Sequence, residues 1–252
     1  MRIFDSHAHY LSGRFDEDRD ELLKSVFFSG VTGIMECATD KQSIEESVLL
    51  SEKYEGVYCA LGVHPHSADE YSPELEARIA ELSEKAAAIG EIGLDYHYDF
   101  HPRELQKSVF EKQLELAKRL SLPVILHSRE ATADMLEILK AQNVSNGVMH
   151  CFSGSPETVE IILGMGLYIG VGGSLTFKGA VKAVEVVKML PMERLLLETD
   201  CPYMTPVPHR GERNDSRYIS IVAEKIAEIK GMSAQDVAET AEKNAKKLFD
   251  IK

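Results

Sequence analysis

The chain has 252 residues, of which 44% are hydrophobic and 27% charged, as is typical of a soluble globular protein. Its net charge of −13 argues against a protein that binds long duplex DNA across its whole surface, because such proteins are usually basic. We find no apolar run long enough to cross a bilayer and expect no secretory signal. The cysteines form no Cys-x-x-Cys pair, which favours a reducing, cytoplasmic location: Cys37, Cys59, Cys151 and Cys201.

Short apolar runs alternate with amphipathic stretches along the whole chain. The apolar runs predict strands at Arg2–Asp5, Gly33–Cys37, Val57–Leu61, Ala87–Gly90, Val124–Leu126, Val148–Met149, Leu167–Val171 and Leu195–Leu197. The stretches between them predict helices at Lys41–Lys53, Pro73–Lys85, Glu104–Leu120, Glu130–Lys140, Pro156–Leu163 and Ala180–Leu190. One more helix is expected over Ser233–Phe249.

Alternation of about eight strands with helices predicts an α/β fold with a parallel sheet, closed as a (β/α)8 barrel. We therefore expect a single domain over residues 1–252, with an additional C-terminal helix. An open, doubly wound sheet is the alternative. It is disfavoured because no Gly-x-Gly-x-x-Gly follows the first predicted strand.

The nine histidines avoid every predicted helix and instead lie at the ends of predicted strands or in the loops that follow them. In a barrel, the carboxyl ends of the strands form one face, where active sites are built. His7 and His9 are two residues apart on an extended backbone, so both imidazoles can face one ion. A hydrogen-bonded surface pair is the alternative interpretation of these two residues.

Four further side chains strengthen the metal interpretation. Glu91 lies among small and apolar residues, where a carboxylate is costly unless it is paired or binds a metal. His127, His150 and Asp200 each follow an apolar run; either histidine could also be a core group with satisfied hydrogen bonds, whereas an unpaired carboxylate at Asp200 would again be costly. Six ligands exceed the needs of one Zn²⁺ and suit two ions that share a carboxylate, for which Glu91 is central: His7, His9, Glu91, His127, His150 and Asp200. The ions can be Zn²⁺, Mg²⁺ or Mn²⁺.

These residues stand in segments that resemble the TatD family of metal-dependent deoxyribonucleases, within the amidohydrolase-like barrel superfamily. The matching segments are Asp5–His9, Gly62–His66, Gly90–Tyr96, His127–Arg129, His150–Gly154 and Glu198–Tyr203. The resemblance implies one metal on His7, His9, Glu91 and Asp200, and a second on Glu91, His127 and His150. The family motif has a proline where this chain has Ser216, and we expect that change to loosen the start of the next helix.

The resemblance implies hydrolysis of phosphodiester bonds in DNA, as a 3'-5' exonuclease on short single strands or ends. Asp200 is then the expected proton acceptor, with Glu91 as the bridging carboxylate, and His64 and Arg129 as contacts to the phosphate or leaving group. Weaker candidates are Lys178 and Arg210 for the phosphate, and Tyr96 and Phe152 for stacking on a base. No membrane contact is expected, and the chain is expected to be a monomer or a small homo-oligomer.

Two other functions stay open at this point. A C–N bond hydrolase of the same superfamily would commonly bridge its metals with a carboxylated lysine, whereas this chain has Glu91. The second alternative is a metal-binding barrel that has no catalytic activity and serves as an interaction partner.

Overall fold

The computed structural model describes residues 1–252, in which strands and helices alternate. The strands are β1 Ile3–Ala8, β2 Val31–Cys37, β3 Val57–Ala60, β4 Ile89–Asp95, β5 Val124–Arg129, β6 Gly147–Met149, β7 Tyr168–Val171 and β8 Leu195–Leu197. The helices are α1 Arg19–Phe28, α2 Lys41–Lys53, α3 Pro73–Leu82, α4 Arg103–Leu120, α5 Thr132–Ala141, α6 Pro156–Gly164, α7 Val181–Met189, α8 Ile219–Lys230 and α9 Ala234–Leu248.

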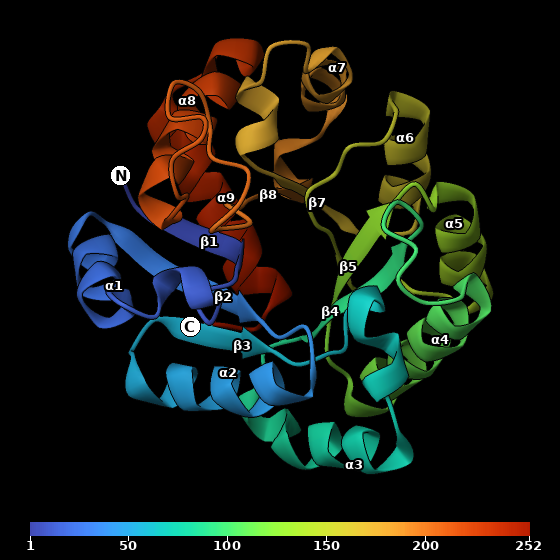
Figure 1. The fold of residues 1–252 in the computed structure, drawn as a ribbon. Helices are drawn as coiled ribbons and strands as arrows, with labels where there is room; N and C mark the ends of the chain where they lie inside the picture. The colour runs from blue at the N-terminus through green and yellow to red at the C-terminus, as the bar shows by residue number, and fades with distance from the viewer.

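The strands are parallel and close into a barrel inside a ring of helices (Figure 1). Strands β1 to β3 pair in one sheet and β4 to β8 in another. Two bridges join these sheets, between Ala60 and Ala88 and between Ala8 and Cys201. The predicted (β/α)8 barrel with an additional C-terminal helix is therefore confirmed.

Side chains from seven strands fill the barrel interior, together with Ala88, which lies just before β4. They form one cluster, with Phe4 from β1, Ile125 from β5, Val148 from β6 and Leu196 from β8 among its members. Helix α9 adds Leu248 to this cluster, and Phe249 follows it, so the C-terminal helix closes the barrel at the end opposite the strands' carboxyl ends. A larger cluster lies between the strands and the surrounding helices. The interior is thus a packed core, and only the carboxyl ends of the strands remain for a site.

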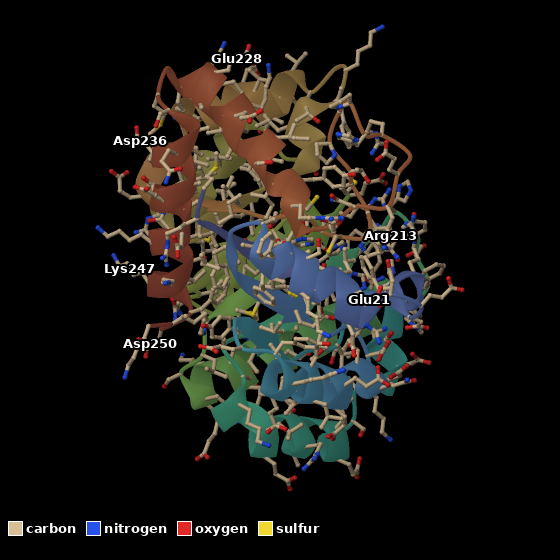
Figure 2. All side chains as sticks on the ribbon, turned by 90° about the vertical axis from the view of Figure 1, so that its left-hand side faces the viewer. Glu21, Arg213, Glu228, Asp236, Lys247 and Asp250 are labelled. Atoms are coloured by element: carbon tan, nitrogen blue, oxygen red, sulfur yellow. The ribbon has the colours of Figure 1, made fainter.

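Charged side chains occupy the outer surface, as the exposed residues Glu21, Glu228 and Lys247 illustrate (Figure 2). No helix combines the length and the apolar character that a membrane span requires. All four cysteines are free.

Several predicted boundaries were wrong. Strands β1, β4 and β5 run beyond Asp5, Gly90 and Leu126, because the backbone keeps pairing with neighbouring strands past the end of the apolar run. His66 lies in a 3-10 helix, Pro65–Glu70, and not in an irregular loop. Helices α1 and α8 were not assigned from the sequence.

The seam between β1 and β8 is held by a buried carboxylate rather than by a full strand ladder. Asp5 accepts hydrogen bonds from the Thr199 backbone N–H at 3.0 Å and from the Ser216 hydroxyl at 2.6 Å. The Ser216 hydroxyl also lies 2.7 Å from the hydroxyl of Tyr10. The expected loosening at Ser216 was therefore wrong, since its hydroxyl ties the segment before α8 to β1.

Candidate metal centre

The alternation of side chains along a strand explains how most of the site residues come to face inward. Ile125, Val148 and Leu196 point into the barrel, so residues two or four positions further along should do the same. These positions are His127, His150 and, after β8, Asp200. Asp200 has a φ of 56°, a left-handed conformation that is uncommon for a residue with a side chain and places its carboxylate at the barrel mouth.

His7 and Glu91 reach the same space through irregularities in their strands. Phe4 points inward, so regular alternation would turn His7 outward; the pairing of β1 shifts register between Asp5 and Ala8. The pairing of β4 shifts in the same way between Ile89 and Ile92, around Glu91. Such shifts change which face a side chain occupies, and they commonly lie beside active sites.

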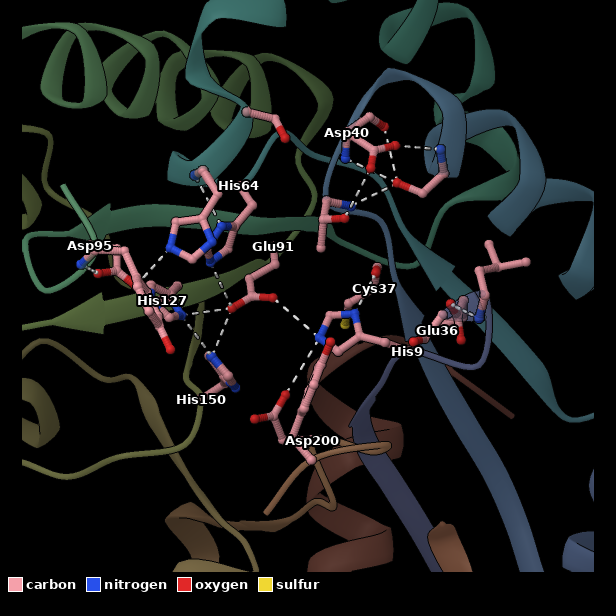
Figure 3. Close-up of a pocket in the computed structure, with 18 of the residues that line it drawn as sticks. His9, Glu36, Cys37, Asp40, His64, Glu91, Asp95, His127, His150 and Asp200 are labelled. Atoms are coloured by element: carbon pink, nitrogen blue, oxygen red, sulfur yellow. Dashed lines mark hydrogen bonds and ion pairs between the residues drawn. The ribbon is translucent and has the colours of Figure 1, made fainter. Parts of the chain in front are cut away.

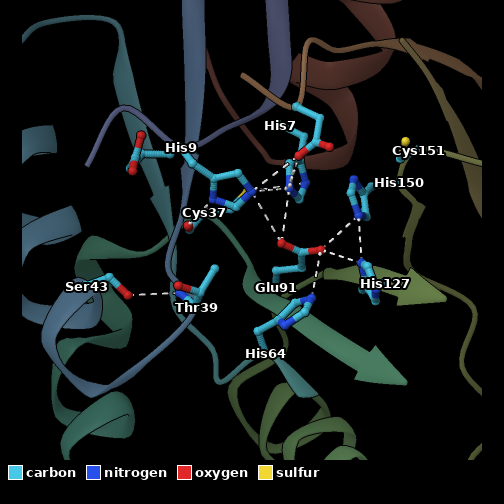
Figure 4. Close-up of polar contacts among 12 residues, drawn as sticks. His7, His9, Cys37, Thr39, Ser43, His64, Glu91, His127, His150 and Cys151 are labelled. Carbon is cyan, nitrogen blue, oxygen red and sulfur yellow. Dashed lines mark hydrogen bonds and ion pairs between the residues drawn. The ribbon is translucent and has the colours of Figure 1, made fainter. Parts of the chain in front are cut away.

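The two carboxylate oxygens of Glu91 face different donors (Figure 4). Its Oε2 lies 3.3 Å from Nε2 of His7 and 3.4 Å from Nε2 of His9. Its Oε1 lies 2.8 Å from Nδ1 of His127 and 2.8 Å from Nε2 of His150. Oδ1 of Asp200 completes the first group, 3.5 Å from Nε2 of His9. Four of the other five predicted ligands therefore contact the buried carboxylate of Glu91, and Asp200 joins them through His9.

Contacts between imidazole nitrogens indicate what this donor set fits. Nε2 of His7 and Nε2 of His9 are 3.0 Å apart, and Nδ1 of His127 and Nε2 of His150 are 3.2 Å apart. Nδ1 of His9 lies 3.0 Å from the carbonyl oxygen of Cys37, to which it can donate, so that Nε2 presents a lone pair. Imidazole and carboxylate donors that converge in this way suit divalent cations.

The histidines of the centre differ in their pKa values. Burial, followed by the charge of His150, lowers the pKa of His7 to about 4, so His7 is neutral at pH 7. For His9, burial disfavours the charged form, but the hydrogen bond with Asp200 and the charge of Glu91 outweigh it and raise the pKa to about 10. A proton on His9 would have to leave when a cation binds, since a ligand imidazole must be neutral on its coordinating nitrogen.

His64 lies beside the centre, but the nitrogen that it turns toward Glu91 carries a proton. Its Nδ1 accepts the backbone N–H of His66 at 3.1 Å, so the proton of the neutral ring is on Nε2. Nε2 points toward Oε1 of Glu91 at 3.7 Å. Burial and the charge of His127 lower the pKa of His64, which keeps the ring neutral. His64 is therefore arranged as a hydrogen-bond donor to the site.

Asp95 is a site residue that the sequence analysis missed. Its Oδ2 lies 3.2 Å from Nε2 of His127 and 3.0 Å from Nε2 of His66, and its Oδ1 accepts backbone N–H groups from His97 and Tyr98. A carboxylate behind a ligand histidine fixes the ring and its tautomer. With the proton of His127 on Nε2, its Nδ1 lone pair faces Glu91. The signal in the sequence was a second carboxylate in the same apolar run as Glu91.

Gly93 explains how β4 and β5 approach each other at this point. Its φ is 149°, and a side chain there would overlap the carbonyl oxygen of His127. The glycine thus permits the close pairing that places His127 beside Asp95.

Glu198 is a second missed carboxylate, fully buried below the centre. Its Oε1 accepts the backbone N–H of Cys151 and lies 3.8 Å from Nδ1 of His150. Burial raises the pKa of Glu198 to about 8. It holds the turn after β6, which carries His150.

A cavity of about 860 Å³ opens over the centre (Figure 3). Arg129 and His64 line it together with Glu91, His127, His150 and Asp200. The weaker sequence candidates do not line it: Lys178, Arg210, Tyr96 and Phe152. Tyr96 instead donates from its hydroxyl to Asp134 at 2.6 Å, and Arg210 lies over the ring of Phe177.

The chain is similar to metal-dependent hydrolases along its whole length. A family model described as "TatD related DNase" matches residues 4–250. A Bacillus subtilis protein named "Uncharacterized metal-dependent hydrolase YabD" is 44% identical over 253 residues, with 99% of each chain covered. A protein from Escherichia fergusonii, named "3'-5' ssDNA/RNA exonuclease TatD", is 32% identical, with 99% of each chain covered.

The crystal structure of the TatD homologue YJJV from Escherichia coli superposes with a TM-score of 0.94 at 34% identity. The match covers 100% of this chain and 99% of that one. The chain therefore belongs to the family of TatD-related deoxyribonucleases and is a metal-dependent hydrolase of that type.

Proposed function

We propose that this protein hydrolyses phosphodiester bonds in DNA with two divalent ions held on either side of Glu91. The observation that carries the proposal is the position of Glu91, whose two oxygens face separate groups of nitrogen and oxygen donors. His7, His9 and Asp200 would complete one metal site, and His127 and His150 the other. Zn²⁺, Mg²⁺ and Mn²⁺ all suit such mixed donors.

Hydrolysis of a phosphodiester needs a nucleophilic water, charge neutralisation and protonation of the leaving oxygen. Divalent ions at this centre supply, when bound, the charge neutralisation and a water that is nucleophilic at neutral pH. Asp200 would accept a proton from the attacking water. Burial would raise the pKa of Asp200, but the hydrogen bond with His9 and the neighbouring imidazoles lower it, so Asp200 is ionised and able to act as a base.

The chain supplies two further groups toward the substrate. His64 presents Nε2–H to the cavity side of Glu91 and can donate a hydrogen bond to a phosphoryl or leaving oxygen. Because the ring of His64 is neutral, the proton that the leaving oxygen takes up would come from Asp200 or from solvent. Arg129 lines the cavity, and its guanidinium forms no ion pair or hydrogen bond within the chain. Its donors are therefore available to hold a phosphate in a bidentate fork.

The proposed substrate is a short single strand or a strand end, processed in the 3'-5' direction. The name of the relative from Escherichia fergusonii supports a single-stranded nucleic acid. A net charge of −13 disfavours a long duplex, which would bring much more negative charge to the surface. The free cysteines support a reducing compartment such as the cytoplasm.

The test is a hydrolysis screen with protein reconstituted separately with Zn²⁺, Mg²⁺ and Mn²⁺. The substrates are a single-stranded oligonucleotide, its duplex, bis(p-nitrophenyl) phosphate and a cyclic amide. We expect hydrolysis of the single strand and the aryl phosphodiester, abolished by a chelator and reduced about 10²-fold or more by Asp200→Asn. Asp250→Asn, an exposed carboxylate that does not line the cavity, is the control. Cleavage of the cyclic amide, with no cleavage of any phosphodiester substrate, would contradict the proposal.

A further inference from the structure

Two aromatic side chains are exposed on the loop between β4 and α4. Tyr98 is 50% exposed and Phe100 is 62% exposed, and both line the cavity over the metal centre. Their rings stack on each other with centroids 5.4 Å apart and planes 15° apart. Large aromatic rings left exposed at the edge of a polar cavity are typical of a binding surface.

These rings are continuous with the candidate metal centre. The ring centroid of Phe100 lies 4.8 Å from that of His66, and the ring of His66 lies 6.5 Å from that of His127. Asp95 holds His66 and His127 through the same carboxylate oxygen. The exposed rings are therefore one side chain away from the proposed metal ligands, and the Asp95 contacts fix that spacing.

A cation accompanies the rings. The guanidinium carbon of Arg129 lies 4.8 Å from the ring centroid of Tyr98. Arg129 lies at the end of β5, immediately after the strand segment that carries His127. A flat aromatic surface next to an unpaired guanidinium is the combination that binds a base and its phosphate in single-stranded nucleic acids.

We propose that Tyr98 and Phe100 form a stacking surface for an unpaired nucleobase of the substrate strand, with Arg129 on an adjoining phosphate. This inference rests on the proposed function, because it places the base beside the phosphate that would lie at Glu91. Each base has a flat π-face, so the surface tolerates all four bases. It selects against a duplex, whose bases are already stacked and paired and must first be separated.

The negative net charge of the chain makes stacking an important source of affinity for a nucleic acid strand. With a net charge of −13, the protein cannot rely on an extended basic groove to attract a polyanion. Stacking on Phe100 and Tyr98 contributes affinity that does not depend on net charge. A second copy of this chain is a less suitable occupant, because charged and polar side chains, including Asp40, Gln42 and Glu46, make up most of the cavity wall.

The test combines removal of a base with removal of a ring. An abasic residue is moved stepwise along a single-stranded oligonucleotide, and kcat/KM is measured for wild type, Phe100→Ala, Phe100→Tyr and the control Phe28→Ala. Phe28 is 96% exposed on α1, so it matches the chemical change away from the cavity. In wild type, one abasic position near the cleaved bond should lower kcat/KM about fivefold to a hundredfold.

Phe100→Ala should lower kcat/KM for the intact strand by a similar factor. For this variant, kcat/KM should be nearly the same whether or not the strand carries the abasic residue at that position. Phe100→Tyr, which keeps a ring, should behave as wild type, and so should Phe28→Ala. An equal effect of the abasic residue in wild type and in Phe100→Ala overturns the stacking surface. A difference in oligomeric state between Phe100→Ala and wild type, measured by ultracentrifugation, also overturns the stacking surface. The rings would then be a contact between subunits.

A binding measurement separates this inference from the proposed function. A strand that carries 2-aminopurine at the same position loses fluorescence when that base stacks. We expect quenching with wild type and Asp200→Asn, and none with Phe100→Ala. Quenching without hydrolysis of any phosphodiester would refute the proposed reaction and retain the stacking surface. Hydrolysis without quenching would refute the stacking surface and retain the proposed reaction.

Discussion

Glu91 is the side chain on which the arrangement depends, because each of its oxygens belongs to a different group of donors. Burial would raise the pKa of Glu91, but the charge of His150 and the hydrogen bond with His127 oppose it and keep the group ionised. A buried carboxylate with so many imidazole neighbours is costly unless a cation completes the set.

Substitution of one histidine from each group should empty different sites. We expect purified His7→Ala and His127→Ala each to lose about one equivalent of metal relative to wild type, because the side chains face opposite oxygens of Glu91. Metal content by atomic emission spectrometry, normalised to protein, checks this. Loss of both metals from either variant would contradict the assignment to separate sites.

Asp95→Asn should weaken metal binding although Asp95 is not itself a proposed ligand. The amide keeps an oxygen for the backbone N–H groups of His97 and Tyr98 but removes the acceptor for Nε2 of His127. We expect about 10- to 100-fold weaker affinity at the His127 site, as for other partners of ligand histidines. Metal titration calorimetry measures it, with Asp134→Asn on α5 as the matched control. Unchanged affinity would show that Asp95 does not orient His127.

At the scale of the elements, the strand pattern predicted the barrel and the face that carries the site. Apolar runs and histidines that follow them are visible in the sequence, and alternation then brings His127 and His150 inward. The register shifts in β1 and β4 were not predictable, because they depend on pairing with neighbouring strands. The contacts of Asp95 and the position of Tyr98 and Phe100 also could not be predicted, since they arise where a loop folds back over the barrel.

Helix α9 is fixed to the barrel by Glu242, whose side chain is 8% exposed. Its carboxylate accepts hydrogen bonds from Arg2 at 3.0 Å and from the Thr32 hydroxyl at 3.0 Å. Burial would raise the pKa of Glu242, but these bonds outweigh it and lower the pKa below its ordinary value of 4.5. The ionised group therefore stabilises the fold above about pH 4.5, and this contribution is lost as the pH falls below that value.

We expect Glu242→Gln to lower the free energy of unfolding by about 1–3 kcal/mol at pH 7. The difference from wild type should shrink as the pH falls from about 5 to 3, where wild-type Glu242 becomes protonated. Urea unfolding of chelator-treated protein across this range measures it, with the exposed Glu239→Gln on the same helix as control. A difference that does not change with pH would contradict the role of the charge.

At the scale of the whole molecule, the distribution of charge limits how a polyanion can bind. The net charge is −13, and Arg129 is the arginine that lines the cavity. Affinity for a strand must then come from the metals, from stacking and from few cationic contacts.

Binding of a single strand should therefore depend only weakly on salt. At about −0.7 per contact, one to three phosphate contacts give a slope of the logarithm of affinity against the logarithm of salt that is no steeper than about −2. A labelled strand titrated with Asp200→Asn at constant metal concentration measures the slope. A value of about −5 or steeper would require an extended basic groove.

The central claim is that Glu91 lies between two bound cations, and anomalous diffraction from crystals grown with Mn²⁺ or Zn²⁺ tests it most directly. We expect two anomalous peaks, one among Glu91, His7, His9 and Asp200 and the other among Glu91, His127 and His150. A single peak with one group of histidines left free would contradict the two-metal site, and peaks remote from Glu91 would contradict the metal centre itself.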